Sequence, residues 1–258
     1  MIKLPDTYII YGANSAIGSD LAKLVQPNVK NLILFYNNNI DRLTEITKYD
    51  NVYLYQSNIT NYDDLLIKLK DIYTNFQINQ MSAVFLPAIR SYDHKSLKET
   101  SLNITREIIE INLFGAINFL KALLNVIPPP DSKENENHPY SNILLLGSNV
   151  SRTGLKNGAV YAATKAAIAN IARSVALEEG GNNVIINTIS PGPVNTKNTT
   201  FDKEYKNFRD EYFETQKTLT SLNKIAETDD VCSLILFLTS LSNKYITGEE
   251  IFITGGAL

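Results

Sequence analysis

The sequence predicts one α/β domain, in which a doubly wound parallel sheet carries helices on both faces. Three observations support this prediction. Strand-like apolar runs alternate with helix-like runs along the chain and are joined by short connections. The first strand-like run leads through a glycine-containing turn into the first helix-like run. A chain of 258 residues can bury one core, and neither an internal repeat nor a low-complexity linker divides it. These features are typical of a single domain built from successive βαβ units.

The predicted elements follow in order from these runs. Short apolar runs predict strands, and longer runs with helical periodicity predict helices. The expected strands span residues 8–11, 32–36, 52–56, 83–86, 143–147, 184–189 and 251–254. The expected helices span residues 17–25, 40–47, 62–76, 105–126, 161–179 and 230–241. Residues 128–139 are polar and punctuated by prolines, which predicts a surface loop.

The composition excludes several classes of function. A net charge of −3 gives no basic surplus that would indicate nucleic-acid binding. The long apolar stretch 111–127 is interrupted by Asn112, Asn118, Lys121 and Asn125, so we expect a core helix and no membrane span. The single cysteine, Cys232, cannot form an intrachain disulfide, and the N-terminus lacks a signal-peptide pattern. We therefore expect a cytoplasmic protein.

The turn from Gly12 to Gly18 joins the first strand to the first helix. Glycine in such a turn lets the backbone approach a pyrophosphate, whose charge is met by the free N–H groups of the helix N-terminus. Its position in the first βα unit favours nucleotide binding, and an ordinary strand-to-helix turn is the alternative.

Tyr161 and Lys165 are four residues apart in a predicted helix and therefore share one face. A neighbouring ammonium favours the phenolate and lowers the pKa of a tyrosine from its usual value of about 10. Ser148 ends the strand-like run 143–147, and the ends of parallel strands are where open α/β sheets build their sites. This arrangement suits acid/base catalysis, although a tyrosine and a lysine at this spacing also occur in many ordinary helices.

These motifs, taken in order, resemble the short-chain dehydrogenase/reductase family over nearly the whole chain. The family's glycine turn is matched at Gly12 and Gly18, its N-x-x-G motif at Asn112 with Gly115, and its proline-glycine segment by residues 185–196. Its serine, tyrosine and lysine fall on Ser148, Tyr161 and Lys165 at the usual spacing. The resemblance implies a Rossmann-like fold and hydride transfer between a nicotinamide cofactor and a carbonyl or secondary alcohol.

The resemblance also assigns site residues. The implied catalytic residues are Asn112, Ser148, Tyr161 and Lys165. Tyr161 would transfer the proton, Ser148 would stabilise the developing alkoxide, Lys165 would hold the nicotinamide ribose, and Asn112 would hold a proton-relaying water. The implied cofactor contacts are Gly12, Asn14, Ser15, Ile17, Gly18, Asn37, Asn58, Ile59, Pro87, Ala88, Tyr161, Lys165, Pro191, Gly192, Val194 and Thr196. No metal is expected.

Departures from the family pattern cluster on the cofactor side. Ala16 replaces a glycine near the phosphates, and Asn58 replaces the usual adenine-contacting aspartate. Residues 86–89, Leu-Pro-Ala-Ile, replace the family's N-N-A-G. The four implied catalytic positions are unchanged, so we expect an altered cofactor fit with the chemistry retained.

Cofactor choice depends on the end of the second strand. A carboxylate there would bind the ribose hydroxyls of NAD and repel the extra phosphate of NADP. Asn37, Asn38 and Asn39 offer no carboxylate, and no arginine or lysine adjoins them. We therefore expect NADP(H) rather than NAD(H), with a simple polar turn as the alternative interpretation.

Substrate recognition is assigned to a lid at about residues 195–225. Phe201, Tyr205, Phe208 and Tyr212 follow at helical spacing in this segment. The resemblance implies that this region is a mobile substrate lid. The periodicity alone equally predicts an amphipathic helix packed on the domain or on a partner subunit. Arg90 and Tyr92 follow the fourth strand and could reach a substrate, whereas His94 is expected in a solvated loop. The alanine-rich helix after Tyr161 and the Asn112 helix form dimer and tetramer contacts in the family, so we expect a homodimer or homotetramer.

The predicted function is an NADP(H)-dependent ketoreductase acting on a small, carrier-linked or peptide-linked keto substrate. A non-catalytic nucleotide-binding scaffold or sensor that kept the fold is the alternative. An enoyl reductase is disfavoured because that related group spaces its tyrosine and lysine more widely. A nucleotide-sugar epimerase or dehydratase would usually need a longer C-terminal substrate domain.

Overall fold

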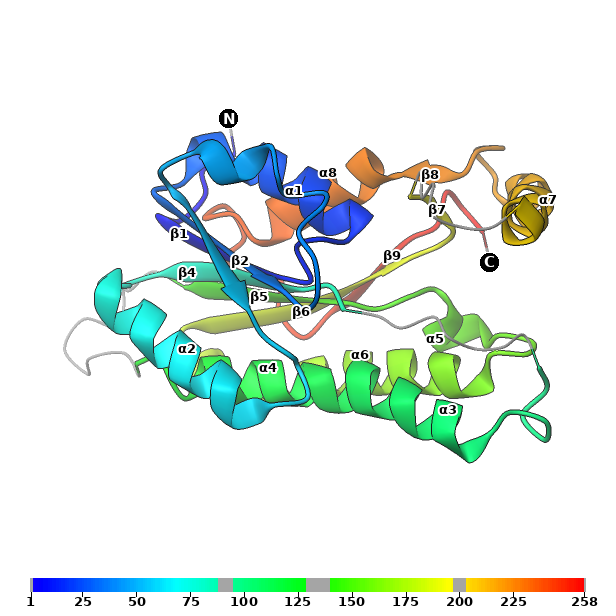
Figure 1. The fold of residues 1–258 in the computed structure, drawn as a ribbon, viewed down its shortest axis with the longest axis horizontal. Coiled ribbons are helices and arrows are strands. Elements are labelled where there is room, and N and C mark those ends of the chain that lie inside the picture. The colour runs from blue at the N-terminus through cyan, green and yellow to red at the C-terminus, as the bar shows by residue number, and fades with distance from the viewer. Residues whose placement is uncertain (1, 88–94, 129–139, 197–202, 258) are drawn as a thin grey trace.

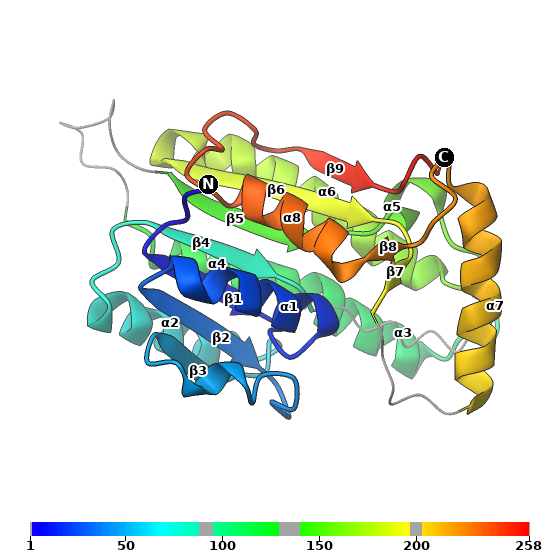
Figure 2. The same ribbon diagram turned by 90° about the horizontal axis from the view of Figure 1, so that it is seen from above.

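The computed structural model describes residues 2–87, 95–128, 140–196 and 203–257, and within the last range it describes side chains from residue 210 onward. Seven strands form one parallel sheet in the order β3-β2-β1-β4-β5-β6-β9 (Figures 1 and 2). They are β1 Thr7–Tyr11, β2 Asn31–Tyr36, β3 Val52–Gln56, β4 Met81–Phe85, β5 Ser141–Leu146, β6 Val184–Pro191 and β9 Glu250–Ile253. The chain order reverses beside β1, so β2 and β4 flank it and open a crevice between β1 and β4.

Helices cover both faces of the sheet, as predicted (Figure 1). One face carries α1 Ala16–Val25 and α8 Thr228–Leu238, whose apolar side chains form a core cluster with Ile10, Leu34 and Leu144. The other face carries α2 Tyr62–Asn75, α3 Leu102–Ile108, α4 Gly115–Leu124 and α6 Ala159–Glu179. The doubly wound α/β prediction is therefore confirmed.

The predicted helix over residues 40–47 is wrong. The segment forms turns that end in a short 3-10 helix, η2 Ile46–Lys48. Leu43 N donates to Ile40 O at 2.7 Å, and Ile46 N donates to Leu43 O at 2.9 Å. The three-residue spacing of these apolar side chains suits consecutive i→i+3 turns, in which such residues line up on one side.

Several short elements were not predicted. They are the 3-10 helices η1 Gln26–Asn28 and η4 Gly180–Asn182, the helix α5 Val150–Thr153, and a small parallel sheet of β7 Val194–Asn195 and β8 Ala226–Glu227. Each is too short to show a hydrophobic period, so sequence pattern cannot identify them.

The carboxyl ends of the strands point towards one end of the molecule, where α5, β7 and β8 lie (Figure 2). Helix α7, Lys203–Leu219, crosses this same end. Parallel α/β sheets place their sites at this edge. In the described part of the chain, no helix combines the length and apolarity needed to cross a membrane.

Candidate active site

The turn between β1 and α1 contains two glycines at positions where a side chain would cause strain or close contacts. Gly12 has φ of 84°, a left-handed conformation that side chains rarely adopt. A Cβ on Gly18 would lie 2.5 Å from the carbonyl oxygen of Gly12. Ser15 caps α1, accepting a 3.0 Å hydrogen bond from Gly18 N. The start of α1 is therefore packed closely against the turn.

A hollow of about 430 Å³ opens beside this turn. It is lined by Gly12, Asn14, Ser15, Tyr36, Asn37, Asn38, Asn39, Leu86, Pro87 and Ile111. Pro87 also explains why Gly12 must be glycine, since a Cβ there would lie 3.2 Å from Pro87 N. A crevice that combines a helix N-terminus, close backbone approach and amide side chains fits the phosphates and polar adenosine part of a dinucleotide.

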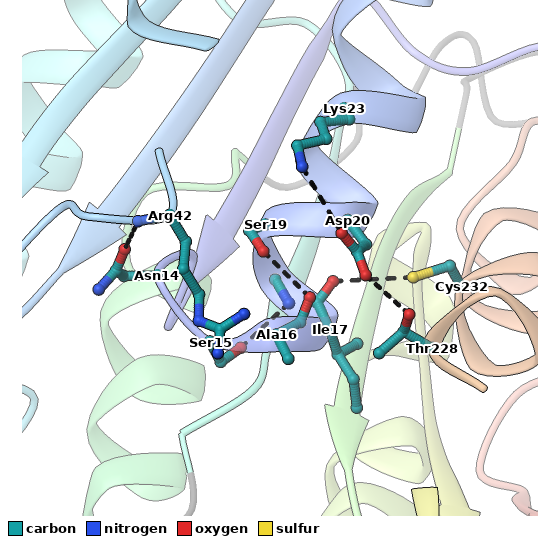
Figure 3. A network of polar contacts seen from close by, with 11 residues as sticks. Asn14, Ser15, Ala16, Ile17, Ser19, Asp20, Lys23, Arg42, Thr228 and Cys232 are labelled. Carbon is teal, nitrogen blue, oxygen red and sulfur yellow. Dashed lines mark hydrogen bonds and ion pairs between the residues drawn. The ribbon is translucent and has the colours of Figure 1, made fainter. Parts of the chain in front are cut away.

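Asn14 ties the turn to the loop that follows β2. Its Oδ1 accepts a 2.9 Å hydrogen bond from Arg42 N, and its Nδ2 donates to Asn39 Oδ1. In Figure 3 the Arg42 side chain extends from its backbone towards the Ser15 end of α1. No arginine or lysine adjoins the asparagines in the sequence, but the turn at residues 40–43 brings Arg42 close to Ser15, which lines the hollow.

The other side of α1 is fixed to α8 (Figure 3). Asp20 accepts a 2.7 Å hydrogen bond from the Thr228 hydroxyl, and the Cys232 thiol lies 3.7 Å from Ile17 O. Burial raises the pKa of Cys232 to about 12, so its thiol stays neutral and serves as a small core group. These contacts hold the helix whose N-terminus faces the hollow.

The structure explains two of the departures from the family pattern. Leu86 is buried and belongs to the same core cluster as Leu144 and Ile189, so its side chain is accommodated by apolar packing. Ala16 begins α1 with ordinary helical geometry, which a methyl group tolerates. Asn58 is different: its Oδ1 accepts hydrogen bonds from both Thr60 N and Thr60 Oγ1, in a local turn outside the hollow lining.

Lys165 is the central residue of the candidate catalytic group, which also contains Tyr161, Ser148 and Asn112. Its side chain is fully buried, and its Nζ donates a 2.6 Å hydrogen bond to Leu146 O at the end of β5. The same nitrogen lies 5.8 Å from the centre of the Tyr161 ring. Helix α6 therefore brings an ammonium group and a phenol together next to the strand end that leads to Ser148.

Asn112 lies at a distortion of the long helix opposite α6. Residues Ile109–Phe114 form a π-helical turn, η3, between α3 and α4. Such insertions into α-helices are frequent at functional sites. Asn112 is fully buried, and its Nδ2 donates to Thr164 Oγ1 at 3.3 Å. The Thr164 hydroxyl in turn donates to Tyr161 O at 2.8 Å. Thr164, which the sequence analysis did not single out, thus links Asn112 to the helix that carries Tyr161.

Ser148 follows β5 on a segment that continues the pairing with β6. Gly147 N donates to Ile189 O at 2.7 Å, and Asn149 N donates to Pro191 O at 2.9 Å. These bonds hold the residues on both sides of Ser148, whose own side chain is half-buried. Ser148, Tyr161 and Lys165 therefore lie on adjoining elements, and Asn112 joins them through Thr164.

Several predicted cofactor contacts do not line the hollow beside Gly12. The side chains of Ile17 and Ile59 are buried in the two cores, so they could reach a cofactor through the backbone alone. Gly192 borders a separate hollow of about 140 Å³ with Thr254 and Gly255, outside the Gly12 hollow. Pro191 ends β6, Val194 lies in β7, and Thr196 is half-buried directly after β7.

Other predictions fall outside the described residues. Ala88, Ile89, Arg90, Tyr92, His94 and Phe201 belong to this group, as do the side chains of Tyr205 and Phe208. The predicted lid does contain a helix, α7, and its Tyr212 and Phe213 rings lie 6.0 Å apart.

The sequence analysis missed some residues that line the Gly12 hollow. Tyr36 and Ile111 are examples. Tyr36 could have been found because it immediately precedes the asparagines at the end of β2. Ile111 gives no such signal, since an apolar residue in an apolar helix looks like any other core residue.

Known proteins of similar sequence and fold place this geometry in context. A family model described as "Enoyl-(Acyl carrier protein) reductase" matches residues 12–257. The 3-oxoacyl-(acyl-carrier-protein) reductase FabG of Buchnera aphidicola subsp. Schizaphis graminum is 23% identical over 97% of this chain and 96% of that protein. The chloroplastic NADPH-dependent aldehyde reductase 2 of Arabidopsis thaliana is 28% identical over 66% of this chain and 58% of that protein. A solved structure, "ElxO with NADP Bound", superposes with a TM-score of 0.81 at 20% identity, over 100% of this chain and 99% of that chain.

Proposed function

The chain belongs to the short-chain dehydrogenase/reductase family, and from that premise we propose that it is an NADP(H)-dependent ketoreductase. Members of the family are nicotinamide-dependent oxidoreductases. The observation that carries the proposal is the buried Lys165 ammonium beside Tyr161, at the strand end that leads to Ser148. Burying an ammonium group costs desolvation free energy. Such costly arrangements are found at functional sites, here where the neighbouring phenol would exchange a proton.

In the proposed reaction, residues such as Gly12, Ser15 and Asn37 would hold the nicotinamide cofactor, which would supply the hydride for the carbonyl carbon. Tyr161 donates its phenolic proton to the carbonyl oxygen as general acid. Lys165 favours the resulting phenolate through its charge. Ser148 donates a hydrogen bond to the oxygen as negative charge develops on it. Asn112 would hold the water through which Lys165 and Tyr161 are reprotonated, with its amide oriented by Thr164.

The preference for NADP(H) is supported by the absence of a carboxylate among the asparagines of the Gly12 hollow and by Arg42 close to Ser15. Asn37, Asn38 and Asn39 present no carboxylate that would repel a 2′-phosphate. Arg42, anchored through its N–H to Asn14, offers a guanidinium that could bind one. The names of two relatives, an NADPH-dependent reductase and an NADP-bound structure, agree with this preference.

The proposed substrate is a small, carrier-linked or peptide-linked ketone or aldehyde. FabG matches nearly the full length of this chain, which favours a 3-oxoacyl thioester among the possible substrates. Helix α7 crosses the carboxyl end of the sheet and would act as the lid (Figure 2). We further propose that the protein is cytoplasmic and that it forms a homodimer or homotetramer. The oligomer is supported by α6, which exposes small residues such as Ala163 and Ala166 that permit close helix packing.

The test is a substrate screen that follows the loss of NADPH or NADH absorbance. The panel contains 3-oxoacyl thioesters, a keto-capped peptide, simple ketones and aldehydes. We expect turnover of at least one carbonyl class, faster with NADPH than with NADH. Absence of turnover together with absence of saturable cofactor binding would favour the non-catalytic scaffold.

Enoyl reduction is a second candidate because the matching family model carries that description. The four-residue spacing of Tyr161 and Lys165 favours carbonyl reduction instead. Adding 2-enoyl thioesters to the panel separates the two, since a ketoreductase leaves them unchanged.

A further inference from the structure

Beyond the site itself, one carboxylate connects the C-terminal strand to the Ser148 turn. Glu250, at the start of β9, accepts hydrogen bonds on Oε1 from the hydroxyls of both Ser151 and Ser190. The Ser190 bond measures 2.6 Å. The two serines come from different elements, α5 and β6, so a single oxygen atom joins three segments of the chain.

One of these serines contacts the residue before Ser148, and the other belongs to the turn after it. Ser190 lies directly against the preceding residue, because a Cβ on Gly147 would be 2.3 Å from Ser190 Oγ. Ser151 closes the turn that follows, since its N–H donates to Ser148 O at 3.0 Å. Glu250 therefore supports the residue before Ser148 and the turn after it at the same time.

A second contact fastens the same short helix to the same strand. The Arg152 guanidinium lies 4.4 Å from the centre of the Phe252 ring, within the range of a cation–π interaction. Glu250 and Phe252 are two residues apart on β9 and so face the same side. Ser151 and Arg152 are neighbours on α5. Two adjacent residues of α5 are thus held by two residues on one face of β9.

We propose that Glu250 is a positioning residue that fixes Ser148 for its hydrogen bond to the reacting oxygen. This inference rests on the proposed function, in which Ser148 is that donor. Helix α5 has only four residues and cannot hold its own geometry. An ionised carboxylate forms short, strong bonds to hydroxyls, which suits a support that must hold a donor within a fraction of an ångström.

The test compares Glu250→Ala with Glu250→Gln and with Glu249→Ala. Glutamine keeps an oxygen that can accept both hydroxyls, whereas alanine removes it. Glu249 is the exposed neighbour, and its backbone bonds survive the change to alanine. We expect Glu250→Ala to lower kcat by about 10- to 100-fold with a smaller change in KM. Glu250→Gln should stay within about fivefold of wild type, and Glu249→Ala should match it.

A double-mutant cycle distinguishes positioning from general stabilisation. If Glu250 acts through Ser148, Glu250→Ala should cause no further loss of kcat once Ser148 is alanine. An equal loss in both backgrounds would overturn the proposal, as would wild-type kcat in Glu250→Ala. Unfolding temperatures measured for each variant confirm that the compared proteins are folded.

Amide hydrogen exchange provides a readout that does not need activity. The Ser151 amide should exchange faster in Glu250→Ala than in wild type, with no change in Glu249→Ala. Unchanged exchange at Ser151 would contradict the positioning role even if no substrate were found. Failure of wild-type protein to reduce any carbonyl, by contrast, would refute the proposed function and leave the exchange result to decide the positioning.

Discussion

The surroundings of Tyr161 and the surroundings of Gly12 have departed from the family pattern to different extents. Around Tyr161, the four residues that the resemblance assigns to catalysis are all present, and Asn112 and Lys165 among them are buried and hydrogen-bonded. Around Gly12, the residues corresponding to Ala16, Asn58 and Leu86 differ from the pattern. Proton transfer needs a particular group at a particular place, whereas a cofactor crevice needs a backbone path and space.

The cofactor side itself shows where change is tolerated. Gly12 and Gly18 remain glycine, and these are the positions where a Cβ would crowd Pro87 or the turn carbonyls. Ala16 and Leu86 differ from the family pattern, and both side chains are accommodated by helix or core packing. The pattern of retained and replaced residues thus follows the available space.

The largest effect that would separate the two regions is expected from Lys165→Met. Methionine keeps the aliphatic volume but removes the ammonium that favours the Tyr161 phenolate and donates to Leu146 O. We expect kcat to fall by about 10²- to 10⁴-fold. Steady-state kinetics with the best substrate of the screen measures this. Lys70→Met, an exposed change on α2, is the matched control, and an equal loss there would point to a nonspecific effect.

Gly18→Ala should damage the other region. The new Cβ would lie 2.5 Å from Gly12 O and force the turn apart, at a cost of about 1–3 kcal/mol in the free energy of unfolding. Because the turn forms one wall of the hollow, NADPH affinity should fall at least about tenfold. Chemical denaturation and calorimetric titration measure the two quantities. Ala16→Gly, a change at the nearby replaced position, should leave affinity within about threefold, and a larger change there would contradict the space argument.

Arg42→Ala should give the smallest of these effects. Loss of one partly screened, charge-assisted contact should weaken NADPH binding about tenfold and leave NADH binding unchanged. The ratio of the two dissociation constants, measured at low and high salt, reports the effect. Arg106→Ala, an exposed change on α3, is the control. Equal weakening of NADH and NADPH would show that Arg42 supports the loop rather than binding the 2′-phosphate.

Local patterns in the sequence were sufficient for most of the fold. Apolar runs located all seven strands of the main sheet, and the strand at 52–56 matches β3 residue for residue. The assignment of Ser148, Tyr161 and Lys165 to catalysis rests on the family resemblance, because a tyrosine and a lysine at this spacing also occur in ordinary helices. The helix predicted at 40–47 failed because a three-residue apolar spacing suits both an α-helix and successive turns.

The remaining features depend on contacts between distant residues. The bond from Arg42 to Asn14 joins positions 28 apart, and the bond from Ser151 to Glu250 joins positions 99 apart. The π-helical turn at Asn112 changes the direction of side chains without changing the composition of the helix. No local pattern carries such information, because it arises from strand order and helix packing.

Tyr161→Phe tests most directly whether Tyr161 donates the proton in a protein whose cofactor-binding residues depart from the family pattern. NADPH affinity and carbonyl turnover are measured on the same preparations of wild type and variant. The substitution removes the transferable proton and keeps the ring, so kcat should fall by about 10²- to 10⁴-fold while the NADPH dissociation constant stays within about threefold. Near wild-type turnover in Tyr161→Phe would contradict this role of Tyr161.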